Sequence, residues 1–392
     1  MPLYDAAILG AGLAGLQCAR QLGAAGLRVV LLDRKASLAS AVHTTGIFVR
    51  RTLEDFDLPA DCLGPAVRHV TLYSPALRPL ELESPHTEFR VGRMAQLYQG
   101  LLADAIRCGV TWLPETRFAD LAPGTPTRIH IERGDRPEVL VTRFVVAADG
   151  AQSRAARHLG LDTNREFLVG IEDVLRGVPL SGPPRFHVFL DPELAPGYIA
   201  WLVNDGEEAH LGVGGYAGRF RALQALEQFR SRLDGIAGLR PAEPVERRSG
   251  LIPVGGVLRR LANPCGLLVG DAAGAVSPLT AGGLDPAVRL SDLAARVIVE
   301  YVATGDPKAL APYSGNAFRA RFISRLAMRR IFAALRWRTP VELGCALLHL
   351  PGMRRLAEHV FFGRGSFPDA PTASPRSLGL QTERQTAAVR SR

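Results

Sequence analysis

The feature that most constrains this chain is a glycine turn near its N-terminus, GAGLAG at Gly10 to Gly15. The turn stands between an apolar run, Tyr4 to Leu9, and a helical pattern, Leu16 to Ala25. A second β run follows at Arg28 to Leu32. Strand, tight turn, helix and strand in this order predict a βαβ unit within a parallel sheet.

Glycines in such a turn let the backbone approach a pyrophosphate that is held at a helix N-terminus. Asp33 ends the second β run, with Arg34 after it. An acid about 20 residues beyond the turn accepts hydrogen bonds from an adenosine ribose. The alternative is a glycine-rich turn with a surface aspartate, but the complete βαβ context favours a dinucleotide site.

Two later segments indicate whether the bound dinucleotide is NAD or FAD. Asp149-Gly150 follows the apolar strand FVVAA, and Gly270-Asp271 follows the strand GLLV. A dehydrogenase that binds NAD does not need two further acidic glycine turns, whereas the longer FAD molecule needs more contacts along the sheet edge. We therefore expect FAD, with Asp271 placed toward its ribityl hydroxyls.

Composition narrows the function classes further. The formal net charge is +9, but nearly all the basic residues are arginines spread along the chain. An even scatter of charge argues against a nucleic-acid surface. The five cysteines are far apart and do not cluster with histidines. We therefore expect neither disulfides nor a metal site, and a cytoplasmic location.

The remaining pattern predicts an α/β fold: a Rossmann-type FAD-binding domain, an inserted substrate domain with an antiparallel sheet, and a C-terminal helical region. Apolar runs such as FLVGIEDVL and RFHVFLD are typical of strands in the inserted domain, with one helix near Phe220 to Leu233. The expected boundaries are 1–66, 93–164 and 253–310 for the FAD-binding domain, 67–92 and 165–252 for the substrate domain, 311–370 for the helical region, and 371–392 for a disordered tail.

At these segments the chain resembles the p-hydroxybenzoate-hydroxylase-like flavoproteins. The segment GDAAGAVSPLTAGGL, with Pro278, Gly282 and Gly283, is most similar to their geranylgeranyl reductase branch. The resemblance implies FAD beneath a helix that starts near Gly283, and a flavin-contacting arginine at Arg93. The residues expected to bind FAD are Gly10, Ala11, Gly12, Leu13, Ala14, Gly15, Asp33, Arg34, Arg93, Asp149, Gly150, Gly270, Asp271, Pro278, Gly282 and Gly283.

The resemblance implies a reductase that adds hydride to a double bond of an isoprenoid or another apolar substrate. A flavin monooxygenase that hydroxylates its substrate with NAD(P)H and O2 is the alternative, because fold predicts substrate poorly. A flavin-binding protein without turnover is a second alternative, because Ala156 and Asn204-Asp205 depart from the family pattern. Gly212 to Ala217 stands on a β run and lacks the last glycine of a nucleotide turn, so NAD(P)H or another electron donor stays open.

Three side chains are candidates for catalysis. The resemblance places His43 close to the flavin, whereas Tyr198 and Trp201 belong to the apolar strand GYIAWLV of the predicted substrate domain. A lone histidine is more often structural, and aromatic residues at this spacing are equally typical of sheet packing. The sequence does not indicate an oligomeric state.

An arginine-rich segment, Phe318 to Trp337, predicts a basic amphipathic helix after the FAD-binding domain. Such a helix can lie on an anionic membrane surface, which would suit an enzyme with a lipid substrate. A solvated basic face on a capping helix is the alternative.

Overall fold

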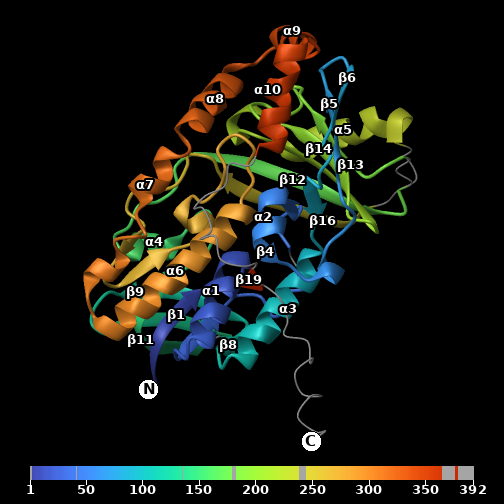
Figure 1. Cartoon of the computed structure of the whole chain (residues 1–392). Coiled ribbons are helices and arrows are strands. Elements are labelled where there is room, and N and C mark those ends of the chain that lie inside the picture. The colour runs from blue at the N-terminus through green and yellow to red at the C-terminus, as the bar shows by residue number, and fades with distance from the viewer. Residues whose placement is uncertain are drawn as a thin grey trace, which may run out of the picture.

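The computed structural model describes residues 2–40, 42–134, 136–178, 182–237, 244–363 and 376–377. The predicted disordered tail, 371–392, lies outside these residues except at Arg376–Ser377. Two large sheets lie one above the other in the view of Figure 1, and the chain crosses between them several times. This mixed α/β architecture is the predicted fold class.

The lower sheet contains the predicted βαβ unit. Its strands are β1 Leu3–Leu9, β2 Val29–Leu32, β8 Thr111–Leu113, β9 Thr116–Ala122, β10 Thr127–Arg133, β11 Arg136–Ala147, β17 Ala262–Asn263 and β18 Gly266–Leu268. Strands β18, β11, β1, β2 and β8 pair in parallel in that order, and β10 and β9 extend the sheet by antiparallel pairing along β11. The chain turns between β8 and β9, where Glu115 adopts a φ of +49°.

Three helices cover one face of this sheet (Figure 1). They are α1 Leu13–Ala24, α3 Met94–Arg107 and α6 Leu284–Thr304. Helix α1 packs between the other two, and its apolar residues join the central core that also contains the parallel strands. The short helices around this domain are α2 Arg50–Asp55, α4 Arg154–His158, η1 Ala60–Cys62, η3 Gly270–Ala273 and η4 Pro307–Leu310.

The upper sheet has seven strands in the order β16-β12-β15-β14-β13-β5-β6. Their bounds are β5 His69–Tyr73, β6 Pro79–Glu83, β12 Phe167–Arg176, β13 Arg185–Phe189, β14 Ala200–Asn204, β15 Glu208–Gly215 and β16 Pro244–Pro253. All neighbouring pairs are antiparallel except β5 with β13. Two small sheets pair β3 Ile47–Val49 with β7 Phe89–Val91, and β4 Phe56–Asp57 with β19 Arg376–Ser377.

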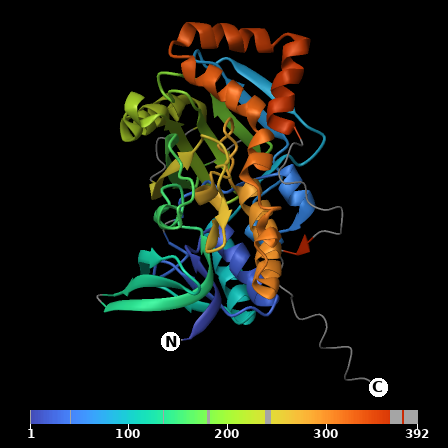
Figure 2. The same ribbon diagram turned by 90° about the vertical axis from the view of Figure 1, so that its left-hand side faces the viewer.

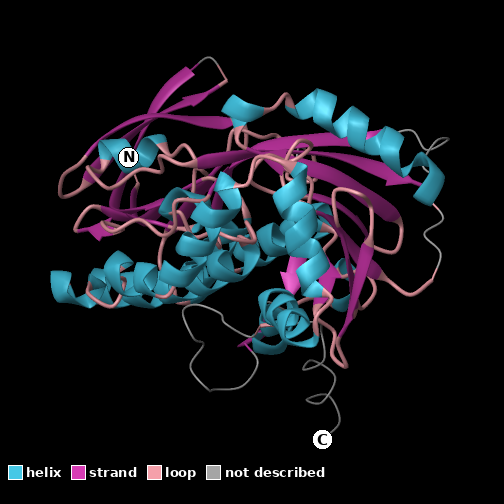
Figure 3. Cartoon of the chain, turned by 90° about the horizontal axis from the view of Figure 1, so that it is seen from above, coloured by secondary structure: helices cyan, strands magenta, loops and turns pink. Residues whose placement is uncertain are grey.

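Helices cover both faces of the upper sheet. Helix α5, Ala222–Ala237, packs on one face, as the sequence predicts, and the short η2, Ala217–Arg219, precedes it. The opposite face packs against the C-terminal helices, a division that is visible from above in Figure 3. The C-terminal helices are α7 Gly315–Ala320, α8 Ile323–Ala334, α9 Arg338–Leu348 and α10 Pro351–Phe362. Of these, α8 to α10 contact the upper sheet, whereas α7 packs through Phe318 into the central core.

The structure corrects the prediction of one helix over Phe318 to Trp337, because the chain breaks at Arg321 and Phe322, between α7 and α8. The buried Phe322 packs into the central core at this break. Helices α8 to α10 then turn back on one another over the top of the molecule (Figure 2). None of the described helices combines the length and the apolar character that a bilayer crossing requires.

Candidate functional site

One cavity of about 1800 Å³ runs between the two sheets. The glycine turn before α1, the loop before β3 and the segment between η3 and α6 line its lower part. The upper sheet and the C-terminal helices supply an apolar wall, which includes Leu72, Phe186, Trp201, Phe332 and Phe361. The cavity therefore joins a glycine-rich compartment to an apolar one.

The glycine turn shows why three of its positions carry glycine. A Cβ at Gly10, whose φ is +108°, would lie 2.4 Å from the carbonyl oxygen of Ala148, and one at Gly15 would lie 1.9 Å from that of Gly10. A Cβ at Gly12 would meet no protein atom within 4 Å, although Gly12 lines the cavity at the N-terminus of α1. Two glycines thus serve packing, and the third leaves room in front of a helix N-terminus.

Asp33 holds the end of β2 against this turn. Its Oδ2 accepts a hydrogen bond from the backbone N–H of Ala11 at 2.8 Å, and its Oδ1 accepts one from Lys35 at 3.0 Å. Asp33 and Arg34 also line the cavity, as do Leu13 and Ala14, whereas Ala11 does not. The turn, its acid and the helix N-terminus therefore meet at one end of the cavity.

Asp149 has a local structural role at the end of β11. Its carboxylate accepts hydrogen bonds from the Ser153 hydroxyl at 2.5 Å and from the backbone N–H groups of Arg154 and Ala155 at 2.8 and 3.0 Å. Three donors occupy this carboxylate at the start of α4. Gly150 beside it has a φ of +86° and lines the cavity, where a Cβ would meet no protein atom.

Asp271 differs from Asp149 because no described residue donates a hydrogen bond to its carboxylate. The side chain is partly exposed, and it faces the cavity. Burial raises the pKa of this carboxyl group to about 6. A carboxylate without a protein partner in a cavity is suited to accept hydrogen bonds from ligand hydroxyls.

The segment after Asp271 brings two predicted glycines to the same wall. Gly282 and Gly283 line the cavity, and Gly283 is the N-cap of α6, so the unpaired N–H groups of this helix begin there. Gly270, with a φ of +58°, lines it as well. Pro278 is buried beside the segment and does not line the cavity.

Arg93 lies elsewhere. Its guanidinium pairs with Glu207 at 2.8 Å and donates to the backbone carbonyl of Asp61 at 3.1 Å, and it is not part of the cavity wall. The structure therefore does not bring Arg93 together with the other predicted cofactor residues. Sequence reasoning missed Arg50, Arg51 and Arg248, which do line the cavity and which no motif marks.

The three catalytic candidates all line the cavity. Burial and the nearby Lys35 charge lower the pKa of His43, so its imidazole is neutral at pH 7. The Tyr198 hydroxyl donates to the carbonyl of Thr280 at 2.8 Å, and burial raises its pKa well above the usual range. The rings of Tyr198 and Trp201 meet edge to face, with centroids 6.3 Å apart.

The glycine-rich run on β15 explains how these aromatic rings fit. A Cβ at Gly212 would lie 2.1 Å from the Trp201 ring, and one at Gly214 would lie 2.7 Å from the Tyr198 ring. Gly212 to Gly215 therefore belong to the strand β15 and accommodate two aromatic side chains, as the β pattern predicts, and do not form a nucleotide turn. Among the described residues, no group of three or more His, Cys, Asp or Glu side chains could hold a metal ion.

Known proteins have sequences similar to that of this chain. A family model for the FAD binding domain matches residues 4–329. The digeranylgeranylglycerophospholipid reductase 1 of Methanopyrus kandleri is 30% identical over 315 residues, which cover 78% of this chain and 83% of the relative.

Solved structures show the same fold. A geranylgeranyl bacteriochlorophyll reductase-like protein from Thermoplasma acidophilum superposes with a TM-score of 0.82 at 20% identity, covering 92% of this chain and 96% of that one. The p-nitrophenol 4-monooxygenase PnpA from Pseudomonas putida superposes with a TM-score of 0.72 at 16% identity, covering 94% of this chain and 100% of that one.

Proposed function

The chain belongs to the FAD-binding-domain flavoproteins, in their geranylgeranyl reductase-like branch, and on that premise we propose that it reduces a double bond in the isoprenoid chain of a lipid. It is an FAD-dependent oxidoreductase. The name of the Methanopyrus relative supports an isoprenoid lipid as the substrate class. The observation that carries the proposal is the single cavity that joins the glycine turn and Asp271 to an apolar wall.

The lower compartment fits FAD. We propose that the pyrophosphate lies over Gly12 at the N-terminus of α1 and that the adenosine ribose lies near Asp33. The ribityl hydroxyls would donate to Asp271, and the N-terminus of α6 at Gly283 would face the flavin ring. The space in front of Gly12 and the unpartnered Asp271 carboxylate support this placement. When bound and reduced, FAD supplies the hydride for the reaction.

The upper compartment fits an apolar chain. Leu72, Phe186, Trp201 and Phe361 would exclude water from the reacting double bond and hold it in one orientation. Tyr198 fixes the loop that carries Thr280, and its raised pKa makes it a poor acid at pH 7. His43 stays a candidate for contact with the cofactor.

A polar end of the substrate would lie near the arginines of this wall. Arg321 and Arg325 line the cavity at the break between α7 and α8, beside the apolar Phe322 and Met328. Guanidinium groups bind phosphate oxygens well, so an isoprenoid chain that ends in a phosphate-bearing headgroup suits this arrangement.

The test is a single-turnover reaction without oxygen. The holoenzyme is reduced with dithionite and mixed with a geranylgeranyl-bearing glycerophospholipid, and the lipid is then examined by mass spectrometry. We expect flavin oxidation together with a lipid mass gain of one H2 for each reduced double bond. Flavin that stays reduced beside unchanged lipid would remove the reductase proposal.

The alternative is a flavin monooxygenase, since PnpA shares the fold. It would need NAD(P)H as the donor, and the candidate for a second nucleotide turn, the glycine run that starts at Gly212, belongs to the strand β15. Oxygen consumption that depends on an aromatic substrate, with incorporation of labelled oxygen into the product, would favour this alternative. Direct reduction of the lipid without oxygen would exclude it as the main activity.

We also propose that the protein is cytoplasmic and docks on the membrane surface through α8 to α10. The five free cysteines support a reducing compartment. Most of the large apolar side chains that are exposed belong to residues 323–356, within these helices and the loops between them. Leu356 is exposed and also lines the cavity, so a lipid could pass from the membrane into the apolar compartment there.

A further inference from the structure

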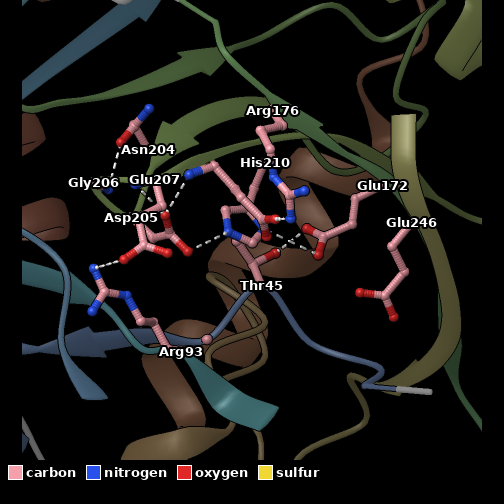
Figure 4. Close-up of polar contacts among 12 residues, drawn as sticks. Thr45, Arg93, Glu172, Arg176, Asn204, Asp205, Gly206, Glu207, His210 and Glu246 are labelled. Carbon is pink, nitrogen blue, oxygen red and sulfur yellow. Dashed lines mark hydrogen bonds and ion pairs between the residues drawn. The ribbon is translucent and has the colours of Figure 1, made fainter. Parts of the chain in front are cut away.

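A row of polar groups crosses the upper sheet from a surface turn to the cavity wall (Figure 4). Asp205 lies in the turn between β14 and β15, and its Oδ2 is 3.5 Å from Nε2 of His210. Nδ1 of His210 is 3.5 Å from Oε1 of Glu172 on β12. The hydroxyl of Thr45, in the loop before β3, donates to Oε2 of Glu172 at 2.5 Å. These four side chains, from three parts of the chain, thus lie one beside the next in space.

The two ends of this row face different surroundings. Thr45 and Glu172 line the cavity. Asp205 is followed by the exposed Gly206 and Glu207 at the surface of the protein. His210 lies between them with an exposure of 2%, so it contacts solvent at neither end. The row therefore joins the outside of the sheet to the site.

Other charged groups pack around the row. Arg248 on β16 lies 3.4 Å from Glu172 and also pairs with Glu246, while Arg176 pairs with Glu208 on the neighbouring strand. Taking several charges out of water costs free energy, and apolar side chains of similar volume are often as stabilising. Stability alone is therefore a weak explanation for this cluster.

The cluster favours a charged histidine. Neither ring nitrogen of His210 makes a hydrogen bond in this arrangement, so its contacts with the two carboxylates are ion pairs at 3.5 Å. Burial would lower the pKa of His210, but Asp205 and Glu172 together raise it to about 9. Burial likewise opposes ionisation of Glu172, and its contacts with His210, Thr45 and Arg248 nevertheless lower its pKa. At pH 7 the row holds an imidazolium between two carboxylates.

Reduction of a double bond consumes a proton as well as a hydride, and an apolar cavity must receive that proton from the protein. We propose that Asp205, His210, Glu172 and Thr45 form the path that delivers this proton, an inference that rests on the proposed reductase function. Thr45 would be the donor to the substrate, and the other three would be positioning and relay residues.

The π bond of the substrate breaks, one carbon accepts the hydride, and the other forms a C–H bond with the proton of the Thr45 hydroxyl. Glu172 passes the Nδ1 proton of His210 to Thr45 Oγ1, which can accept as well as donate. His210 is then neutral and keeps its other proton on Nε2. A half-turn of the ring about its Cβ–Cγ bond exchanges the two nitrogens, and Asp205 passes a proton from solvent to the empty one. The substrate is reduced, and the hydride donor is oxidised.

The first experiment compares variants in the anaerobic single-turnover reaction of the holoenzyme with the geranylgeranyl lipid. Replacement of one relay group should slow substrate reduction by about 100-fold, as for the loss of a general acid. We expect this for His210→Gln, Glu172→Gln and Thr45→Val, whereas Thr45→Ser should restore the rate. FAD affinity should not change in any of them.

Matched controls exist on the same sheet. His187 on β13 bonds the Tyr73 hydroxyl at 3.1 Å outside the cavity wall, and burial lowers its pKa to about 4. Thr71 on β5 accepts from Arg185 at 2.6 Å, also outside the wall. His187→Gln and Thr71→Val should react at the wild-type rate. If His210→Gln fails to fold, Thr45→Val decides, because it removes only a hydroxyl at the cavity wall.

The second experiment does not depend on turnover. Histidine side-chain NMR of the apoprotein should show one imidazole that titrates near pH 9 and that is missing in His210→Gln. A His210 that titrates at or below about 6.5 would overturn the relay. So would wild-type rates for both Thr45→Val and His210→Gln in an enzyme that reduces the lipid. A wild-type enzyme that leaves the lipid unchanged would instead refute the reductase function itself.

Discussion

Gly12 and Gly15 lie in the same turn but face different surroundings, and this difference separates folding from cofactor binding. A Cβ at Gly15 would overlap the Gly10 carbonyl, which is backbone and cannot move aside. Gly15→Ala should therefore lower the free energy of unfolding by about 3 kcal/mol or more. Gly12→Ala should leave the thermal midpoint of the apoprotein unchanged, yet raise the Kd for FAD at least about tenfold.

Thermal unfolding of the apoproteins and FAD titration by fluorescence would measure both effects. Gly100→Ala on α3 is the control, because its Cβ would also meet no protein atom, but at a distance from the cavity wall. Wild-type FAD affinity in Gly12→Ala would show that the pyrophosphate does not lie over this residue.

Asp271 should affect apoprotein stability and cofactor affinity in opposite directions. Its folded-state pKa, about 6, is above the usual value of 3.8, so the carboxyl group favours folding below pH 3.8 and loses that advantage as the pH rises through 6. Asp271→Asn should therefore stabilise the apoprotein at pH 7, by on the order of 1 to 3 kcal/mol. The same variant should bind FAD more weakly, since an amide is a poorer acceptor for ribityl hydroxyls than a carboxylate.

Denaturant unfolding at pH 5 and pH 8, with FAD titrations at both, would test this. We expect wild-type FAD affinity to fall below pH 6, where the carboxyl group is protonated, and the affinity of Asp271→Asn to be independent of pH in that range. An apoprotein that Asp271→Asn destabilises at pH 8 would contradict the unpartnered state of this carboxylate.

At the scale of elements, helix α8 buries an arginine side chain against two tyrosine rings. Arg329 is 1% exposed, with its guanidinium 5.7 Å and 5.1 Å from the ring centroids of Tyr198 and Tyr216. It also donates to the Tyr216 hydroxyl at 3.3 Å. Arg329→Ala removes packing and two cation–π contacts, so it should lower the free energy of unfolding by about 2 to 3 kcal/mol.

The next residue in the helix provides the comparison. Arg330 is exposed, and Arg330→Ala should change stability by less than about 0.5 kcal/mol. Limited proteolysis would show whether Arg329→Ala also makes α8 more accessible than in the wild type. Equal stability of the two variants would mean that the tyrosines do not hold α8 on the sheet.

Some elements could be predicted from the sequence, and the start of α8 could not. The βαβ unit and the strand GLLV have periodicity and local turn chemistry, so their elements could be predicted within a few residues. The break at Arg321 and Phe322 depends on Phe322 packing into a distant core, which no local pattern encodes. For the same reason a basic helical face was expected where the structure buries Arg329.

At the scale of the whole molecule, local sequence predicts some residues of the cavity wall and not others. Gly10 and Gly270 have positive φ angles, which favour glycine, so these positions of the wall can be recognised from the sequence alone. Thr45, Glu172 and His210 meet only because β12, β15 and the loop before β3 pack together. The resemblance implies Arg93 in the site, but its guanidinium pairs with Glu207 and the residue does not line the cavity.

The exposed apolar residues of α8 to α10 and of the loops between them should make the molecule bind membranes. Ile331, Trp337 and Leu343 have exposed fractions of 67%, 70% and 63%. Their burial in the interface of a bilayer would add hydrophobic free energy to the attraction between the arginines and anionic lipids. In co-sedimentation with phosphatidylglycerol vesicles, the protein should bind, and changing all three residues to serine should weaken binding at least about tenfold.

Three exposed apolar residues on other parts of the surface form the control. Ile106, Leu223 and Val245 are 47%, 47% and 49% exposed, and changing them together to serine should leave vesicle binding unchanged. Added salt should weaken binding of the wild type without abolishing it, because only the electrostatic part is screened. Equal loss in both triple variants would indicate a general surface effect, and binding by neither wild type nor variants would leave the lipid to reach the cavity without membrane docking.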